Sequence, residues 1–195
     1  MPLRTRAFRF ALAAVCATSF ALAPALTSAQ DEPPGAPVPP ELSEAARKVY
    51  NQGLREVREM IARKDYAAAG TRADALLATR PREPQARFLK GVVQTELEQN
   101  ALAIATFRAL IEDYPELPEP YNNLAFIYAQ RGEYELARLA LETAIRAAPD
   151  WAVAHENLGD VYARLAAAQY NRAAALDRSN KTAPAKLVLV RSLLK

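Results

Sequence analysis

Three prolines spaced 34 residues apart, Pro81, Pro115 and Pro149, show that this 195-residue chain contains an internal repeat. Other positions keep the same period, since an alanine lies 12 residues before each proline, at Ala69, Ala103 and Ala137. A period of this length, with a small residue and a closing proline at fixed offsets, is typical of stacked two-helix hairpins. Such a stack presents a curved surface and encloses no catalytic cleft, so the repeat favours a binding role.

The third repeat, residues 118–151, has the most complete pattern. Large apolar or aromatic residues occupy its positions 4, 7, 11 and 24, small residues occupy positions 8, 20 and 27, and proline occupies position 32: Tyr121, Leu124, Tyr128, Leu141, Ala125, Ala137, Ala144 and Pro149. Small residues allow two helices to approach closely, large residues fill the space between hairpins, and proline ends the second helix. These residues are therefore predicted to form the core.

This pattern resembles the tetratricopeptide repeat (TPR), a helix–turn–helix unit of 34 residues, over roughly residues 50–180. The resemblance implies an all-α fold: a right-handed superhelical stack of antiparallel helix hairpins, or TPR-like α-solenoid. We divide the predicted TPR domain as follows: the whole domain at 42–195, repeats at about 50–83, 84–117 and 118–151, a degenerate repeat at 152–180, and a capping helix at 183–194.

The first two repeats depart from the pattern in their first helices. In the first repeat, a long helix is predicted over 43–63 with Ser43 as its N-cap, and the second helix over 66–79. In the second repeat, Arg87 and Lys90 occupy positions that are usually apolar. Four apolar neighbours are predicted to take over the packing there: Phe88, Leu89, Val92 and Val93.

The fourth repeat lacks the five residues that would form the turn between its two helices. In their place stands the run Leu-Ala-Ala-Ala-Gln at 165–169, which consists of strong helix formers. A single continuous helix is therefore predicted from about Ala152 to Asp177. Its end, with Asn171 and Arg172, is expected to project past the body of the stack.

A last helix is predicted after Thr182, with this threonine as N-cap and Pro184 in the first turn. Five apolar residues are predicted to lie on one wide arc of it: Leu187, Leu189, Val190, Leu193 and Leu194. This arc is consistent with a helix that caps the last repeat, and also with a dimer seam or a docking helix.

The N-terminal segment has the layout of a secretory signal peptide. Residues 1–29 contain three early arginines, an apolar run and a small-residue site, which predicts cleavage after Ala29. An uncleaved membrane anchor is the alternative. Residues 30–41 are rich in proline and are predicted to form a disordered linker. Together these segments predict a bacterial periplasmic protein.

Composition narrows the chemistry that is available to the predicted mature chain. Without residues 1–29 it has 22 basic and 22 acidic residues and no cysteine. The balanced charge gives no indication of nucleic-acid or anionic-membrane binding, and the missing thiols exclude disulfides and thiolate chemistry. The single histidine, His155, stands at a packing position of the repeat and is predicted to be a core or half-buried residue. No phosphate loop, nucleophile elbow or carboxylate pair is evident, so we predict no enzyme activity, metal, cofactor or small-molecule substrate.

In TPR proteins the first helix of each hairpin lines the concave groove, and the resemblance places the candidate site there. Asparagine occupies position 6 in repeats three and four, at Asn123 and Asn157. In TPR proteins that bind extended peptides, asparagine at this position often pairs with the peptide backbone, because its amide offers both a donor and an acceptor. The alternative is that it binds water. Phe126, at position 9, is predicted to be an exposed anchor for a partner side chain. The complete candidate groove is Asn122, Asn123, Phe126, Gln130, Glu156, Asn157, Asp160 and Arg164.

Two functional hypotheses follow from the sequence. The first is a non-enzymatic protein–protein interaction scaffold of the bacterial cell envelope, which binds a peptide segment or partner protein in the groove. The groove has one arginine beside two acids, and so lacks the Lys and Arg cluster that would clamp a C-terminal carboxylate. The second is a structural subunit of an envelope assembly, which acts through homo-oligomerisation or docking of its C-terminal helices, including residues 187–194.

Overall fold

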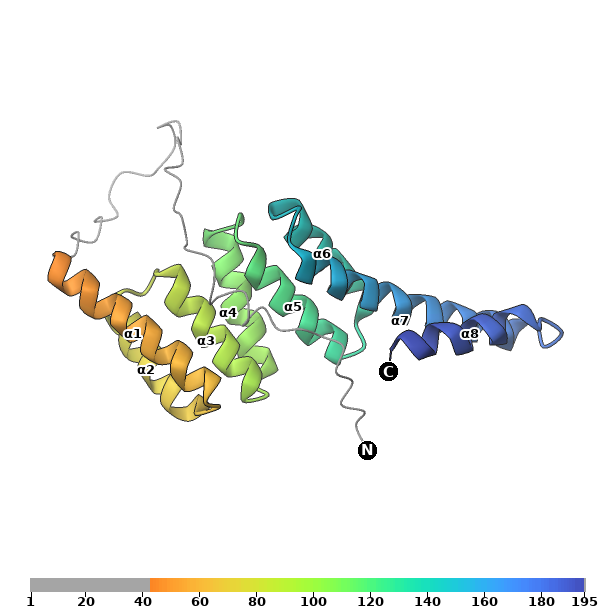
Figure 1. Cartoon of the computed structure of the whole chain (residues 1–195), viewed down its shortest axis with the longest axis horizontal. Coiled ribbons are helices and arrows are strands. Elements are labelled where there is room, and N and C mark those ends of the chain that lie inside the picture. The colour runs from red at the N-terminus through yellow and green to blue at the C-terminus, as the bar shows by residue number, and fades with distance from the viewer. Residues whose placement is uncertain (1–42, 195) are drawn as a thin grey trace.

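The computed structural model describes residues 43–194, and every regular element in that range is an α-helix (Figure 1). The helices are α1 (Glu44–Ala62), α2 (Tyr66–Thr79), α3 (Pro84–Glu96), α4 (Asn100–Asp113), α5 (Pro118–Gln130), α6 (Tyr134–Ala147), α7 (Ala152–Leu176) and α8 (Thr182–Leu193). The predicted signal peptide and the predicted proline-rich linker lie outside the described residues. Within them, the predicted all-α architecture is confirmed.

The helices form the hairpins that the repeat predicts, with α1 packed on α2, α3 on α4 and α5 on α6. The α1 N-terminus is capped as predicted, because the Ala46 backbone N–H donates to Ser43 Oγ at 3.2 Å. The second helix of repeat one has the predicted bounds, Tyr66–Thr79. The continuous helix is also confirmed, since α7 runs unbroken for 25 residues.

The turns inside the three hairpins share one backbone feature. The residue at position 15 of each repeat has a positive φ: 63° at Lys64, 58° at Glu98 and 76° at Gly132. Only glycine adopts this left-handed conformation without a steric penalty from Cβ. The hairpin geometry therefore imposes the same backbone shape on all three turns, although only one of them has the residue that suits it.

Replacing Glu98 by glycine is expected to raise the free energy of unfolding by about 0.5–1 kcal/mol. The side chain of Glu98 is exposed and φ is 58°, so the change relieves strain and removes no packing. Urea unfolding followed by circular dichroism measures it. Glu59→Gly, at an exposed position within α1, is the matched control and is expected to lower stability. Equal losses in both variants would contradict the strain argument.

Small residues bring the paired helices into close contact, as the sequence predicts. Ala69, Ala103 and Ala137 are fully buried. At Gly91 in α3, an added Cβ would lie 2.5 Å from Cε1 of Phe107 in α4, which is far inside van der Waals contact. The Phe107 ring therefore rests directly on the α3 backbone. The four apolar residues predicted to pack repeat two are all buried, whereas Arg87 and Lys90 form ion pairs with Asp113 and Asp74.

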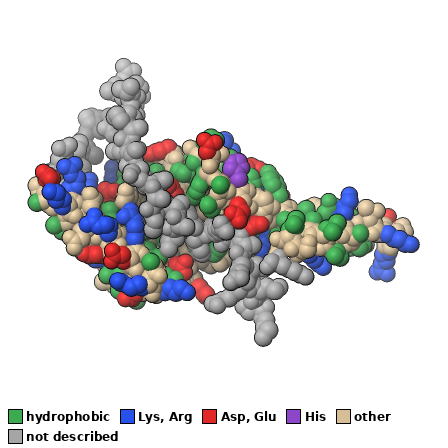
Figure 2. Space-filling view, viewed as in Figure 1, with side chains coloured by type: hydrophobic (Ala, Val, Ile, Leu, Met, Phe, Trp, Pro, Cys, Tyr) green, Lys and Arg blue, Asp and Glu red, His purple; other side chains and the backbone are tan. Residues whose placement is uncertain are grey.

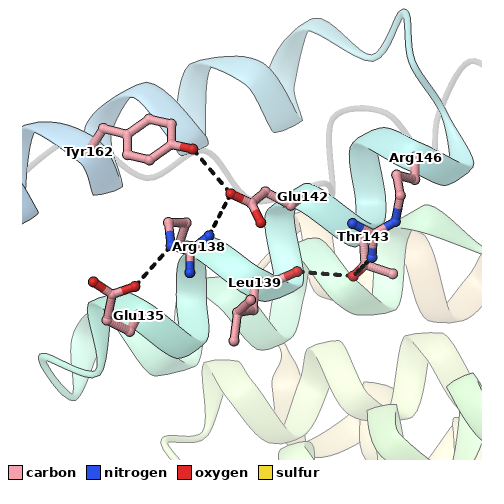
Figure 3. A network of polar contacts seen from close by, with 7 residues as sticks. All are labelled: Glu135, Arg138, Leu139, Glu142, Thr143, Arg146 and Tyr162. Carbon is pink, nitrogen blue, oxygen red and sulfur yellow. Dashed lines mark hydrogen bonds and ion pairs between the residues drawn. The ribbon is translucent and has the colours of Figure 1, made fainter.

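A polar network on one side of α6 fixes the first half of α7 (Figure 3). Arg138 contacts Glu135 and Glu142 at 2.9 and 2.7 Å, and the Tyr162 hydroxyl of α7 donates to Glu142 Oε1 at 3.1 Å. The hydrogen bond from Arg138 lowers the pKa of the Glu142 carboxyl from its ordinary value. Because exposed ion pairs each add little stability, we infer that this network mainly orients α7.

The second half of α7 and the helix α8 extend past the body of the stack (Figure 1). Leu165 is the last α7 side chain that packs against the main core. Beyond it, α8 folds back along α7 and buries Ala183 and Leu187 in their contact. We call residues 166–194 the α7–α8 arm.

Two predictions about α8 are wrong in detail. Thr182 is the first residue of the helix and not its N-cap; instead Asn180 Oδ1 accepts from the backbone N–H groups of Thr182 and Ala183, at 3.0 and 2.9 Å. The predicted single arc is also divided. Leu187 faces α7, whereas Leu189 and Leu193 are 67 % and 71 % exposed. The division arises because α8 packs mainly against one described helix, α7, so only one narrow side of it is covered.

Candidate functional site

The candidate site is built on the first helices of the hairpins, α1, α3, α5 and α7. Figure 1 shows α1, α3 and α5 following one another across the molecule, and α3 contacts both of its neighbours. Polar side chains connect successive first helices at two places. Arg58 Nη2 on α1 donates to Gln85 Oε1 on α3 at 2.9 Å, and Asn157 Nδ2 on α7 donates to Asn122 Oδ1 on α5 at 2.8 Å.

Two predicted site residues, Asn122 and Asn157, meet between α5 and α7, and a third, Asn123, follows Asn122 on α5. Asn122, Asn123 and Asn157 are 0 %, 1 % and 0 % exposed. The amide of Asn123 is oriented by its own helix, because Nδ2 donates to the Glu119 backbone carbonyl at 2.8 Å. Burial of the Glu119 side chain raises the pKa of its carboxyl. The structure thus gathers asparagines from two neighbouring repeats into one buried polar cluster, which we call the asparagine cluster.

Two amide groups of the asparagine cluster have no hydrogen-bond partner among the described residues. One is a donor, Asn122 Nδ2, and the other is an acceptor, Asn123 Oδ1. A buried polar group without a partner costs about 1–3 kcal/mol. Asn122 Nδ2 can donate to a carbonyl and Asn123 Oδ1 can accept from an N–H group, and a peptide backbone carries both kinds of group.

The structure places the other predicted site residues around this cluster. Phe126 lies one turn after Asn122 on α5 and is 8 % exposed, so the prediction of an exposed anchor is wrong. Gln130 is exposed at the end of α5, and Glu156 is exposed on α7. Asp160 is half-buried; burial, and then the neighbouring Glu156 charge, raise the pKa of its carboxyl, whereas Arg164 lowers it.

Arg164 on α7 connects the candidate site to the preceding helix, α6. Its guanidinium lies 5.6 Å from the centre of the Tyr134 ring on α6, which is a cation–π distance. The sequence analysis missed Arg58 and Gln85, although they occupy groove positions 9 and 2 of repeats one and two. A search of positions 2 and 9 in every repeat, and not only in repeats three and four, would have found both residues.

The described residues offer no further chemical centre. His155 is exposed, with Nε2 2.8 Å from the Pro149 carbonyl oxygen, so its predicted core placement is wrong. Other side chains of α7 pack against α6, so His155 is left at the surface. Within residues 43–194, no group of three or more His, Cys, Asp or Glu side chains could hold a metal ion.

Comparisons with known proteins agree with this geometry. The family described as tetratricopeptide repeat matches residues 118–151, whereas a comparison with curated proteins found no match. Among solved structures, the chain is similar to the Sgt2 TPR domain from Aspergillus fumigatus, with a TM-score of 0.58 and 17 % identity, covering 62 % of this chain and 82 % of that one.

Two bacterial structures are similar over more of the chain. The Yersinia enterocolitica type III secretion chaperone SycD, in complex with a peptide of the translocator YopD, has a TM-score of 0.56 and 18 % identity over 67 % of this chain and 99 % of that one. A thermophilic TPR protein from Thermus thermophilus has a TM-score of 0.56 and 26 % identity over 72 % of this chain and 81 % of that one. The α-solenoid fold predicted from the repeat is therefore confirmed.

Proposed function

Since residues 118–151 are a tetratricopeptide repeat and the chain has the fold of TPR proteins, we propose that this protein is a non-enzymatic scaffold that binds an extended peptide segment of a partner protein. The segment lies across α5 and α7 at the asparagine cluster. The observation that carries the proposal is the pair of unpartnered groups on consecutive residues, Asn122 Nδ2 and Asn123 Oδ1. Both residues are buried, so the proposal requires the side chains that cover them to move aside when the peptide binds.

The proposed contact uses the backbone of the peptide. A peptide carbonyl accepts from Asn122 Nδ2, and a peptide N–H donates to Asn123 Oδ1. Each of these hydrogen bonds contributes about 0.5–1.5 kcal/mol. The hydrogen bonds of Asn122 to Asn157 and of Asn123 to Glu119 hold both amides in place before the peptide arrives, which lowers the entropy cost of binding.

The surroundings of the cluster indicate which peptides fit. Phe126, one turn after Asn122 on α5, is 8 % exposed and offers little apolar surface to a peptide. Glu156, Asp160 and Arg164 lie four residues apart along α7 and give the next part of the site mixed charge. Neutral or mixed-charge peptide segments are therefore favoured over strongly acidic ones. The structure of SycD with a YopD peptide supports the proposal, because there the same fold holds a peptide.

We further propose that the scaffold works in the bacterial cell envelope and that residues 1–29 direct its export. After cleavage, the proline-rich segment 30–41 is the N-terminal part of the mature chain and precedes the helical domain. N-terminal sequencing of the exported chain tests the cleavage site, for which the expected first residue is Gln30.

Peptide selection followed by affinity measurement tests the site. A random peptide library is selected against residues 30–195, which include every described helix, and fluorescence anisotropy gives Kd for the tightest peptide. Asn122→Ala with Asn123→Ala is expected to weaken binding about 10- to 100-fold, because two hydrogen bonds are lost. Asn171→Ala, the same change at an exposed position of the α7–α8 arm, is the matched control and is expected to leave Kd unchanged.

Thermal unfolding of each variant separates a lost site from a lost fold. An unchanged Kd in the folded double variant would contradict the proposal, as would failure to select any peptide. Methylating single amide nitrogens of the peptide gives an independent test: one position is expected to weaken binding to the wild type, and to have no further effect in Asn123→Ala.

A further inference from the structure

The charges of this protein are distributed unevenly between its body and its α7–α8 arm. Residues 43–165 contain sixteen Lys or Arg and eighteen Asp or Glu, whereas residues 166–194 contain five Lys or Arg and a single acid, Asp177. In Figure 2 the arm shows hydrophobic and basic side chains with almost no acidic ones. The neutral total of residues 30–195 thus conceals a basic projection on a slightly acidic body.

The basic side chains of the arm are not neutralised by neighbours. Four of them form no ion pair within residues 43–194: Arg172, Arg178, Lys181 and Arg191. The fifth, Lys186, lies 5.7 Å from the centre of the Tyr170 ring. In the body, by contrast, several acidic side chains pair with an arginine or lysine: Glu56 on α1, Asp74 on α2, Asp113 on α4, and Glu135 and Glu142 on α6. The arm therefore presents uncompensated positive charge.

The same arm exposes a row of large apolar side chains. Val188, Leu189 and Leu193 lie on the side of α8 that faces away from α7, and they are 68 %, 67 % and 71 % exposed. Leu176, at the end of α7, is 76 % exposed. Lys186 precedes Leu189 by three residues and Arg191 follows Val188 by three, so both cations lie beside these residues on the helix surface. We call Val188, Leu189 and Leu193 the α8 strip.

We infer that the α7–α8 arm is a peripheral docking surface for an anionic lipid bilayer. The α8 strip enters the interface between headgroups and acyl chains, while the flanking Lys and Arg side chains contact lipid phosphates. An exposed apolar row bordered by cations is the pattern of helices that lie in a membrane interface. Within the described residues no helix is long and apolar enough to cross a membrane, so the contact concerns the bilayer surface. This surface is separate from the asparagine cluster and does not depend on the peptide-binding proposal.

Charge favours lipid over a second copy of the chain. Two arms that met through their α8 strips would bring Lys186 and Arg191 of one copy close to the same residues of the other, and like charges in contact are costly. The body of another copy carries sixteen Lys or Arg beside eighteen Asp or Glu, so its mixed charge attracts the arm less than an anionic bilayer does. An anionic bilayer offers both negative charge and an apolar phase.

Vesicle co-flotation tests the inference with residues 30–195, because residues 1–29 are apolar and would bind lipid by themselves. The wild type is expected to float with phosphatidylcholine vesicles that contain about one third phosphatidylglycerol, and not with pure phosphatidylcholine. Raising the salt from about 0.05 to about 0.5 M is expected to weaken binding strongly, since the contact is partly electrostatic.

Matched variants locate the contact on the arm. Leu189→Glu with Leu193→Glu is expected to lower the partition coefficient at least about 30-fold, through loss of apolar insertion and added negative charge. Leu102→Glu with Leu139→Glu makes the same change at exposed positions of the body, 55 % and 50 % exposed, and is expected to reduce it much less. Arg178→Gln with Arg191→Gln is expected to reduce binding about tenfold or more at low salt, and to have little effect at high salt.

Three results would overturn the inference. The first is that the wild type floats equally with both kinds of vesicle, or with neither. The second is that the arm and body leucine variants lose equal amounts of vesicle binding. The third is that an arm variant binds vesicles as the wild type does. Sedimentation velocity tests the alternative that a second copy of the chain binds the α8 strip. A wild-type dimer that dissociates in Leu189→Glu/Leu193→Glu, without vesicle binding, would assign the α8 strip to a second copy and would also reject lipid docking.

Discussion

Replacing Phe107 by alanine is expected to lower the free energy of unfolding by about 3–5 kcal/mol, the range for removing a fully buried aromatic ring. Phe107 has no exposed surface, its ring centre lies 5.9 Å from that of Phe88, and its edge rests on the α3 backbone at Gly91. The residue therefore connects both helices of repeat two. Urea unfolding monitored at the helical circular dichroism band measures the change. Phe107→Leu, which keeps most of the volume, is the control and is expected to cost markedly less.

A double-mutant cycle with Gly91 tests the contact itself. Gly91→Ala alone is expected to be destabilising, because its Cβ would overlap the Phe107 ring. In the Phe107→Ala background the ring is gone, and alanine's better helix propensity, about 1 kcal/mol, makes the same change neutral or stabilising. Identical effects of Gly91→Ala in both backgrounds would show that the two positions are not coupled.

Removing Asn157 is expected to lower the free energy of unfolding by about 1–3 kcal/mol, because Asn122 Oδ1 would be left buried without its donor. Thermal or urea unfolding of Asn157→Ala measures this loss. Asn122→Ala breaks the same hydrogen bond, so thermal unfolding is measured beside Kd for the peptide-binding variants as well. Asn171→Ala, exposed on the same helix, is the control and is expected to cost little.

The Asn122→Ala/Asn157→Ala double variant extends this test to the pair. Its loss is expected to be smaller than the sum of the two single losses, because the second change removes the group that the first left unpaired. Strictly additive losses would indicate that the 2.8 Å hydrogen bond contributes nothing to stability.

Local sequence explains the parts of this fold that were predicted correctly. The start of α1, the end of α2 and the unbroken α7 depend on residues close together in the chain: the N-cap at Ser43, the proline that closes each hairpin and the alanine-rich run at 165–169. The buried alanines at 69, 103 and 137 follow from the same period. The prolines and the alanines recur every 34 residues, so each hairpin supports the interpretation of the next.

The sequence predicted which helices carry the candidate site, but not how its side chains contact one another. Asn123 and Asn157 occupy the same position in two repeats, and equivalent positions suggest equivalent roles. In the structure their amides differ: Asn157 donates across to Asn122, whereas Asn123 donates to the carbonyl of Glu119 in its own helix. The rotation between successive hairpins decides which side chains meet, and a repeat pattern does not specify that rotation. The proposed use of these amides in peptide binding stays a prediction.

The sequence by itself determined the repeat, the number of hairpins and the fusion of the fourth repeat's two helices into α7, because spacing, caps and helix propensity are local properties of the chain. The tertiary structure decided which polar atoms are buried without a partner, that His155 is at the surface, and that Leu189 and Leu193 face away from α7. It also decided that residues 166–194, whose five cations are close together in the sequence, project from the body as an arm (Figure 1). Burial and charge density depend on contacts between helices, and these are fixed only when the hairpins stack.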